Sequence, residues 1–462
     1  MKKEEKIFDA ITNIDDEIIE EAKNIEPRKK YNKWIRNGFI AASFLFVLGI
    51  GIFLSSNKES PTDIRPLLAV NYPKAYAFDD YETRFAVREE NPIDNNLISI
   101  INNFAYETSS IILSQETDNI NYSPISLYYA LSLATSGADG QTSKELLDLL
   151  GVSDINFLSE QLANLYNLLY FENDIGQLKI ANSIWMSNDF RGQAVEFKDS
   201  YVENAAKNFY ASSYELDFED ENTPKAMAEW ISTNTNGTIS PNIELSDDQI
   251  LSIINTIYFY DEWVDKFDEK NTAKDTFYLL DKSKVDVDFM NTIKSSQIFY
   301  KGENYTRSIL NLKNAGGMVF ILPDEGISPY DLIDSSDKVK EVFEDGKEAI
   351  GEVVWKIPKF EFASTLKLKD SLQKLGVSDA FSDKADFSRM TDNFAFISDV
   401  IQESHISIDE RGVEASAYTK IDYDGSALPV DKAYMILDRP FIYGITASNG
   451  TLLFLGVCDN PK

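Results

Sequence analysis

The chain has 462 residues, of which 43% are hydrophobic, so it can form one large domain with a sizeable core and additional segments. Its formal net charge of −32 argues against nucleic acid as the main partner, because binding to phosphates requires basic patches. A single cysteine, Cys458, excludes an internal disulfide, and a single histidine, His405, excludes metal sites with several histidines. We therefore expect neither a metal nor a cofactor.

An uncharged run from Gly38 to Leu54 predicts a membrane anchor. As a helix it would span about 26 Å, which is at the short end for a bilayer core. Only Lys58 follows it closely, whereas the basic residues that precede it are Arg28, Lys29, Lys30, Lys33 and Arg36. This asymmetry predicts a single-pass anchor in the cell membrane over residues 37–56, with residues 1–36 in the cytoplasm and the rest of the chain outside.

A cleaved signal peptide is the alternative for the same run. Its n-region would comprise residues 1–37, which is long, and no strong small-x-small cleavage site is present. A single cysteine and many Lys, Asn and Ile residues fit a bacterial surface protein.

The part of the chain after the anchor divides into a linker and one large domain. Residues 57–92 contain four prolines and mixed charges, which predict a linker with little structure of its own. In residues 93–462, the first half is mainly helical, for example from Ser143 to Leu150, where Gly151 stops the helix. The second half is rich in strands, such as Met318 to Leu322. Helices at one end and strands at the other predict an α+β fold.

The segment from Ile408 to Gly425 has an unusual pattern. From Val413 onward, small or apolar residues alternate with polar or amphipathic ones, which is the period of a half-buried strand. Its first half is nevertheless rich in Ala and Ser, which are poor strand formers. The pattern indicates a segment that can enter a sheet without always lying in one.

Several motifs in this order resemble the serpin family, over about Ile93 to Pro461. The matching segments are Asn121–Ser126, Gly137–Thr142, Ala181–Trp185, Trp230 with Thr235–Ile239, Asn255–Phe259 with Trp263 and Phe267, Ile357–Phe360, Leu375–Val377, Ala385–Phe387 and Asp438–Phe441. The resemblance implies three β-sheets, about eight or nine helices and an exposed reactive loop. It also implies a suicide mechanism, in which a protease is acylated by the loop and the freed loop arm then inserts into the central sheet.

The resemblance also assigns the hinge of this loop. The hinge residues are Glu410, Arg411, Gly412, Val413, Glu414, Ala415, Ser416, Ala417, Tyr418 and Thr419. The glycine supplies backbone freedom, and the side chains that would enter the core after insertion are small or β-branched. Tyr418 departs from the family, which has a small residue there, but the alternation places it on the outward face.

Counting along the hinge from Glu410 places the reactive bond between Ser426 and Ala427. A small residue before the cut favours elastase-like or subtilisin-like proteases as partners. Cleavage at Gly425–Ser426 or near Leu428–Pro429 stays open. Lys420 would attract trypsin-like enzymes, but too early in the loop for full insertion.

The resemblance further implies a polar cluster beneath the strands that open, formed by Ser123, Ser126, Asn255 and Gln402. Gln402 stands where the family often has His, so no proton-dependent gating is expected there. Trp263 matches the tryptophan at the site of initial insertion.

Three functions follow from these residues. The first is a monomeric, membrane-anchored inhibitor of extracellular serine (or cysteine) proteases. The second is a non-inhibitory member of the same family that serves as a surface binding or sensing module. The third, a hydrolase, would require His405 to be catalytic, although His405 lies in an ordinary alternating strand pattern. We predict an inhibitor rather than an enzyme.

Overall fold

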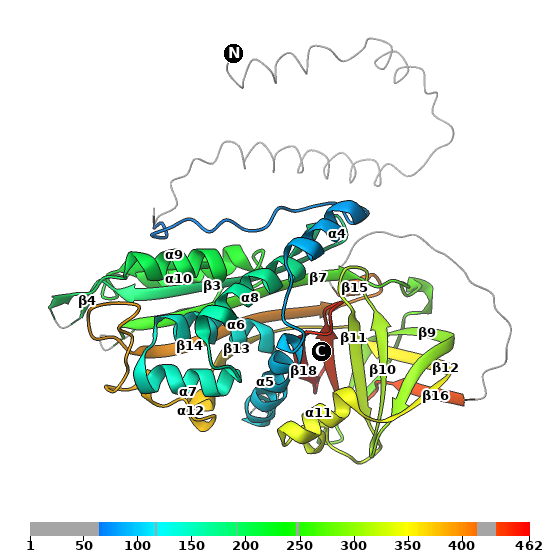
Figure 1. The fold of residues 1–462 in the computed structure, drawn as a ribbon. Coiled ribbons are helices and arrows are strands. Elements are labelled where there is room, and N and C mark those ends of the chain that lie inside the picture. Colours follow the sequence, from blue (N-terminus) through cyan, green and yellow to red (C-terminus); the bar gives the residue numbers. More distant parts are fainter. Residues whose placement is uncertain (1–63, 116–117, 191, 246–248, 414–430) are drawn as a thin grey trace, which may run out of the picture. The chain divides into compact units, whose positions relative to one another are not determined.

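Helices prevail in the first half of the folded chain and strands in the second, as the sequence predicts for an α+β fold (Figure 1). The computed structural model describes residues 64–115, 118–190, 192–245, 249–413 and 431–462. They belong to one unit, which runs from Ile64 to Lys462. The predicted anchor over residues 37–56 lies outside the described residues. In the part of the chain that is described, no helix has the length and apolarity to cross a membrane.

The described residues form nine α-helices and four short 3₁₀ helices. The α-helices are α4 (Tyr81–Glu90), α5 (Leu97–Ile112), α6 (Pro124–Gly137), α7 (Gly140–Leu150), α8 (Ile155–Leu169), α9 (Asp199–Asn208), α10 (Thr223–Asn234), α11 (Ser336–Glu344) and α12 (Lys369–Lys374). The 3₁₀ helices are η1 (Leu113–Gln115), η2 (Glu269–Asn271), η3 (Pro329–Leu332) and η4 (Asp379–Phe381).

Three sheets contain the strands of the described residues. The strands are β1 (Ile120–Tyr122), β2 (Phe171–Asn173), β3 (Gly176–Ser187), β4 (Asp189–Phe190), β5 (Gln193–Ala194), β6 (Ala211–Leu216), β7 (Leu251–Glu262), β8 (Ala273–Tyr278), β9 (Lys284–Lys301), β10 (Tyr305–Asn311), β11 (Gly317–Pro323), β12 (Lys347–Pro358), β13 (Phe360–Lys367), β14 (Ile397–Ile408), β15 (Gly412–Val413), β16 (Asp431–Ile436), β17 (Phe441–Thr446) and β18 (Leu452–Cys458).

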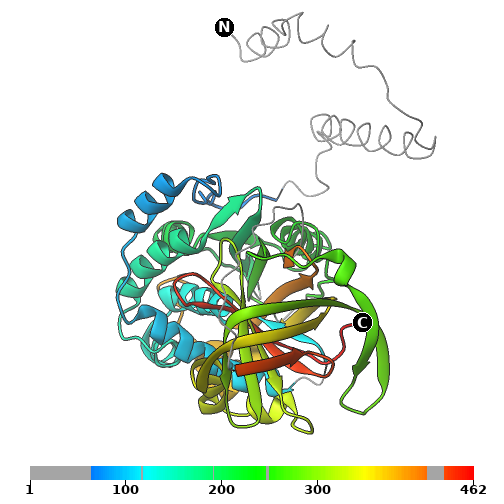
Figure 2. The same cartoon turned by 90° about the vertical axis from the view of Figure 1, so that its right-hand side faces the viewer.

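A seven-stranded sheet positions the candidate site. Its order is β13-β14-β15-β7-β3-β2, with β6 beside β3. The nine-stranded sheet has the order β1-β18-β17-β11-β10-β9-β12-β16, with β8 beside β9. In Figure 2 the red β16 runs beside β12 at the edge of this second sheet. β4 and β5 form the third, two-stranded sheet.

Helix ends agree with the local sequence. Gly151 caps α7 with φ of 71°, a left-handed conformation that glycine adopts without a steric penalty, so the predicted stop is confirmed. Ser123 caps α6, and Pro124 occupies its first turn, where proline loses no helical hydrogen bond.

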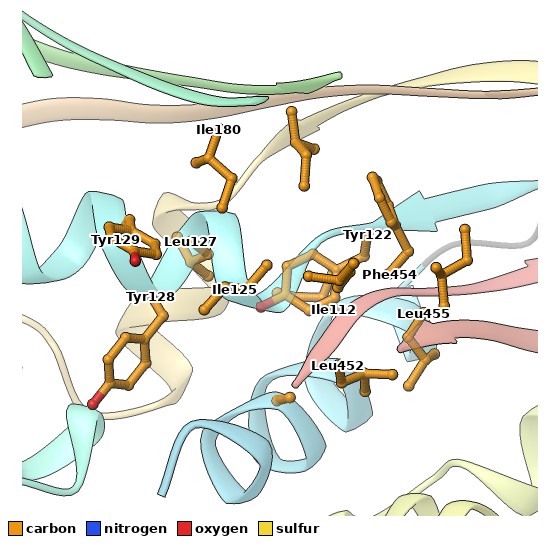
Figure 3. Packing of buried hydrophobic residues seen from close by; sticks show 14 of the residues in the cluster. Ile112, Tyr122, Ile125, Leu127, Tyr128, Tyr129, Ile180, Leu452, Phe454 and Leu455 are labelled. Carbon is orange, nitrogen blue, oxygen red and sulfur yellow. The ribbon is translucent and has the colours of Figure 1, made fainter. Parts of the chain in front are cut away.

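Helix α6 lies inside the main core. Figure 3 shows its side chain Leu127 near Ile180 of β3, with Phe454 of β18 in the same cluster. On the other face of the seven-stranded sheet, Ile254 of β7 packs against Ile231 of α10. α6 and α10 therefore cover opposite faces of this sheet.

Residues from Ile64 to Pro92, which fall in the predicted linker, belong to the same unit as the rest of the described chain and contain helix α4. The ring of Tyr72 stacks on Tyr210 with centroids 6.1 Å apart, and the Lys179 ammonium group lies 4.3 Å from the centre of the Tyr72 ring. No proline occurs between residues 73 and 92, so helix α4 can form there.

Candidate functional site: the opening of the seven-stranded sheet

The predicted hinge begins as a two-residue strand inside the seven-stranded sheet. Val413 of β15 pairs with Ile408 of β14 on one side and with Asp261 of β7 on the other. Further along, β14 and β7 pair directly with each other as parallel strands, from Ile397 to Ser404 on β14. At one end of the sheet, β15 therefore lies between β14 and β7. Along the rest of their length, β14 and β7 are direct neighbours.

The two strands already have the register that a strand inserted between them would need. Gln402 pairs with Asn255, which is 147 residues away in the sequence. Ile408 and Asp261, which flank Val413, are separated by the same number of residues. Because the offset is the same in both places, insertion of a longer strand requires the strands to move apart but not to slide.

The backbone of β7 approaches position 412 so closely that only glycine fits there. A Cβ atom at this position would lie 2.3 Å from the carbonyl oxygen of Asp261 and 2.7 Å from the Cα of Glu262. Gly412 is absent from the described glycines with positive φ, so its role in this state is to leave room rather than to provide an unusual dihedral.

Trp263 holds the turn formed by Asp409, Glu410 and Arg411, at the start of the hinge. Its indole N–H donates to the carbonyl oxygen of Asp409 at 3.0 Å, and its backbone N–H donates to the carbonyl oxygen of Arg411 at the same distance. The backbone N–H of Phe267 donates to the carbonyl of Glu410 at 2.9 Å. Trp263 is 1% exposed. The structure therefore places it against the predicted hinge.

The Glu410 carboxylate links the hinge to two other elements. It accepts a hydrogen bond from the Thr272 hydroxyl at 2.7 Å and forms an ion pair with Lys359 at 2.9 Å. Burial favours the neutral acid, but these hydrogen bonds outweigh it and hold the pKa of Glu410 below its usual value. Neither partner was predicted, because both contacts join residues far apart in the chain.

The last two residues of β7, beside the hinge, carry buried carboxylates. Asp261 accepts hydrogen bonds from the backbone N–H groups of Asn314 and Ala315 at 2.8 and 2.7 Å, yet burial raises its pKa to about 6. Glu262 forms ion pairs with Lys266 at 3.0 Å and Lys313 at 2.7 Å. Sequence reasoning missed both acids.

The structure brings the four residues of the predicted polar cluster together. The side-chain amide of Gln402 donates to the carbonyl of Ser123 at 2.9 Å, and its oxygen accepts from the Ser123 backbone N–H at 2.8 Å. The Ser126 hydroxyl donates to the side-chain oxygen of Asn255. All four residues are at most 1% exposed, so these bonds are shielded from water.

Asn182 belongs to the same cluster, although it was not predicted. Its side-chain oxygen accepts from the Asn255 amide at 2.7 Å, which joins β3 to β7. Asn182 lies in the motif Ala181–Trp185 and is fully buried. A buried amide in the middle of a strand motif was the available signal.

His405 lies on β14 and contacts an acid. Its Nε2 lies 3.2 Å from the carboxylate of Glu361, whose side chain is 70% exposed. The described residues contain no group of three or more His, Cys, Asp or Glu able to hold a metal. The remaining hinge residues and the predicted reactive bond, from Glu414 to Thr419 and at Ser426–Ala427, lie outside the described residues.

Three sheets with covering helices, and a buried polar cluster beneath β14 and β7, are the arrangement that resembles the serpins, a family of protease inhibitors. The chain belongs to this family: the family profile described as Serpin (serine protease inhibitor) matches residues 99–461. Serpins are typically protease inhibitors and not enzymes.

Individual relatives agree with this membership. A serine protease inhibitor of Cyanea capillata is 28% identical over 369 residues, which cover 76% of this chain and 95% of that protein. Serpin-Z2A of Triticum aestivum is 28% identical over 405 residues, covering 82% and 96%. The native-state crystal structure of Tengpin, a thermophilic serpin, matches with a TM-score of 0.73 and 25% identity, covering 86% of this chain and 100% of Tengpin.

Proposed function

We propose that this protein is a monomeric suicide-substrate inhibitor of extracellular serine proteases. The target cleaves the bond between Ser426 and Ala427. The carbonyl carbon of Ser426 becomes esterified to the catalytic serine of the protease, and the amino group of Ala427 leaves with the C-terminal fragment. The freed segment after Gly412 then enters the sheet between β14 and β7 before water hydrolyses the ester.

The observation that carries this proposal is the position of β15. Gly412 and Val413 already occupy the first row between β14 and β7, in the register that the rest of the sheet shares. Insertion therefore lengthens a strand that is already paired and does not have to form the first strand pairs. The hydrogen bond that the Gln402 amide of β14 donates to the side-chain oxygen of Asn255 on β7 must exchange partners as these two strands part.

The proposed target has an elastase-like or subtilisin-like specificity, because Ser426 presents a small side chain to the pocket that precedes the cut. Purified full-length protein incubated with such a protease is expected to form a complex that survives boiling in detergent. The released fragment should begin at Ala427, and its mass identifies the bond.

A matched pair of variants tests whether insertion is required. Ala417→Arg places a charge on the face that would enter the core, whereas Ser416→Arg places the same charge on the outward face. The first variant should be cleaved without a stable complex, and the second should still inhibit. Clean cleavage of the wild type, with neither a complex nor a rise in melting temperature, would instead indicate a non-inhibitory serpin.

We also propose that residues 38–54 anchor the inhibitor in the cell membrane, with the serpin unit outside. The support is the uncharged run and the basic residues before it. Intact cells treated with an external protease should lose the serpin unit but keep the cytoplasmic segment. Deletion of residues 38–54 should release the protein from the membrane fraction.

A further inference from the structure

A cavity of about 260 Å³ lies between helix α4 and neighbouring parts of the unit. Three regions that are far apart in the sequence line it. The first is α4, and the second is the end of α8 with the start of β2. The third consists of the turn between β10 and β11 and the turn between β17 and β18, which lie at the same end of the nine-stranded sheet. Figure 1 shows α4 beside α8.

Three basic side chains line this cavity, and among the described residues no aspartate or glutamate does. The basic residues are Arg84 and Arg88 of α4, and Lys313 of the turn between β10 and β11. Arg84 and Arg88 are four residues apart, so they lie on the same face of the helix. The charge of the cavity is therefore opposite in sign to the net charge of the chain, which is −32.

In the described part of the chain, no acid neutralises the two arginines of α4. The Arg84 guanidinium donates to the carbonyl oxygen of Phe78 at 2.8 Å, and its central carbon lies 5.4 Å from the centre of the Phe78 ring. Arg88 is exposed in the last turn of the helix. Neither arginine forms an ion pair with a carboxylate of the described residues. Both positive charges are therefore available to an anion in the cavity.

The third cation shares its acidic partner with another lysine. Lys313 forms an ion pair with the buried Glu262 at 2.7 Å, and Lys266 forms an ion pair with the same carboxylate at 3.0 Å. One negative charge thus faces two positive charges. Because the Lys313 side chain is 24% exposed and lines the cavity, the excess positive charge of this group extends into the cavity.

Apolar side chains complete the lining. They come from Val87 of α4, Leu168 of α8 and Phe171 of β2. Ser448 and Asn449, from the turn between β17 and β18, add polar groups. Apolar lining with a few polar groups is typical of sites for small organic molecules, which usually measure about 300–1,000 Å³. At about 260 Å³, this cavity suits a compact ligand.

Burial of side chains does not explain the position of α4. Its N-terminus is capped, since Asp80 accepts from the Thr83 backbone N–H at 3.0 Å, yet none of its residues is buried. Helices in proteins are usually stabilised by packing an apolar face, which α4 does not have. The helix also lies outside residues 99–461, which match the family profile, so membership in the family assigns it no role. Its face with Arg84, Val87 and Arg88 lines the cavity instead.

We infer that this cavity binds a small organic anion with two or more negative charges, such as a phosphate monoester or a tricarboxylate. Arg84 and Arg88 hold the anionic groups through charge-assisted hydrogen bonds, and Lys313 supplies a third positive charge. The carbon skeleton of the ligand lies against the apolar lining. The inference does not depend on the proposed inhibition, because none of these residues belongs to the hinge or to the reactive bond.

Calorimetric titration of the full-length protein at low ionic strength tests this inference. The probes are citrate, glucose 6-phosphate and, as a control with a single charge, acetate. Citrate or glucose 6-phosphate should bind with one molecule per chain, and acetate should show no measurable binding. Arg84→Gln and Arg88→Gln should each weaken binding about tenfold or more, because each removes a charged hydrogen-bond donor. Added salt should also weaken binding.

A matched variant separates the site from general effects of charge. Lys144→Gln removes one positive charge from an exposed position on α7 and should leave the affinity unchanged. Arg88 is exposed and unpaired among the described residues, so Arg88→Gln should keep the wild-type melting temperature and report on binding alone.

The outcomes decide both the site and the chemistry of its ligand. Binding of citrate alone identifies a carboxylate site, and binding of glucose 6-phosphate alone identifies a phosphate site. The inference is refuted if neither binds, if acetate binds equally well, if Arg88→Gln binds like the wild type, or if Lys144→Gln weakens binding as much as Arg88→Gln. Protease inhibition measured on the same samples tests the proposed function separately.

Discussion

The side-chain amide of Gln402 forms two hydrogen bonds with the backbone of Ser123, one in each direction. This arrangement satisfies both backbone groups of the residue that caps α6 and ties that helix to β14. Gln402 also lies within 3.4 Å of the Asn255 side-chain oxygen on β7. One side chain thus connects the buried helix to the two strands that are proposed to separate.

Replacement of Gln402 by Leu should destabilise the protein. The backbone N–H of Ser123 would then be left buried without a partner, at a cost of about 1–3 kcal/mol in the free energy of unfolding, whereas the Ser123 carbonyl oxygen still accepts from the Leu127 N–H. Urea unfolding monitored by tryptophan fluorescence measures the change. Ser407→Ala, a partly exposed site on the same strand, is the control and should change stability by about 0.5 kcal/mol or less. Equal stabilities of the two variants would contradict the role of the amide.

Glu403→Gln should stabilise the uncleaved protein at pH 8. Burial raises the pKa of Glu403, a residue of β14, from its usual 4.5 to about 7, so its favourable contribution is complete below about pH 4.5 and is lost as the pH rises through 7. The neutral amide avoids this loss, which amounts to about 2–4 kcal/mol.

The pH dependence provides the control for this prediction. The difference in stability between wild type and Glu403→Gln should grow from pH 5 to pH 8, as measured by thermal unfolding at each pH. Asp261 also titrates in this range, with a pKa raised to about 6, but it is present in both proteins and cancels in the difference. A difference that stays constant with pH would show that Glu403 is already ionised at pH 5.

Gly412→Ala should expel β15 from the sheet. The added Cβ would meet the backbone of Asp261 and Glu262, and overpacking of this kind costs about 1–3 kcal/mol. Hydrogen exchange should show faster exchange of the Val413 amide, with stability lowered in chemical denaturation. The neighbouring Arg411→Ala, at an exposed position, is the matched control. Unchanged protection of the Val413 amide in Gly412→Ala would refute the steric argument.

The ion pair between Glu410 and Lys359 should couple by about 1 kcal/mol, because the Lys359 side chain is 38% exposed and water screens the charge. A double-mutant cycle with Glu410→Gln and Lys359→Met measures this coupling. The pKa of Glu410 is lowered, so its contribution is present above its usual value of 4.5 and disappears as the pH falls. Coupling that stays constant as the pH is lowered would contradict this assignment.

Local patterns in the chain were sufficient for the fold class and for many element positions. The glycine after Leu150 ended α7 as predicted, because a left-handed cap depends on one residue and its neighbours. The apolar run Met318–Leu322 became the centre of β11. The family motifs placed Ser123, Ser126, Asn255 and Gln402 in one cluster, since the family resemblance carries information on contacts between distant residues.

Contacts between distant residues decided the rest. Residues 64–92 pack on the unit because Tyr72 contacts Tyr210 and Lys179. No pattern within the segment reveals those partners. Local alternation separated inward from outward positions in the hinge, but it did not identify the strands between which the hinge begins. The pairing of Val413 with Ile408 on one side and Asp261 on the other sets the register of β15 in the sheet. Register depends on how strands align across the sheet, which only the folded arrangement determines.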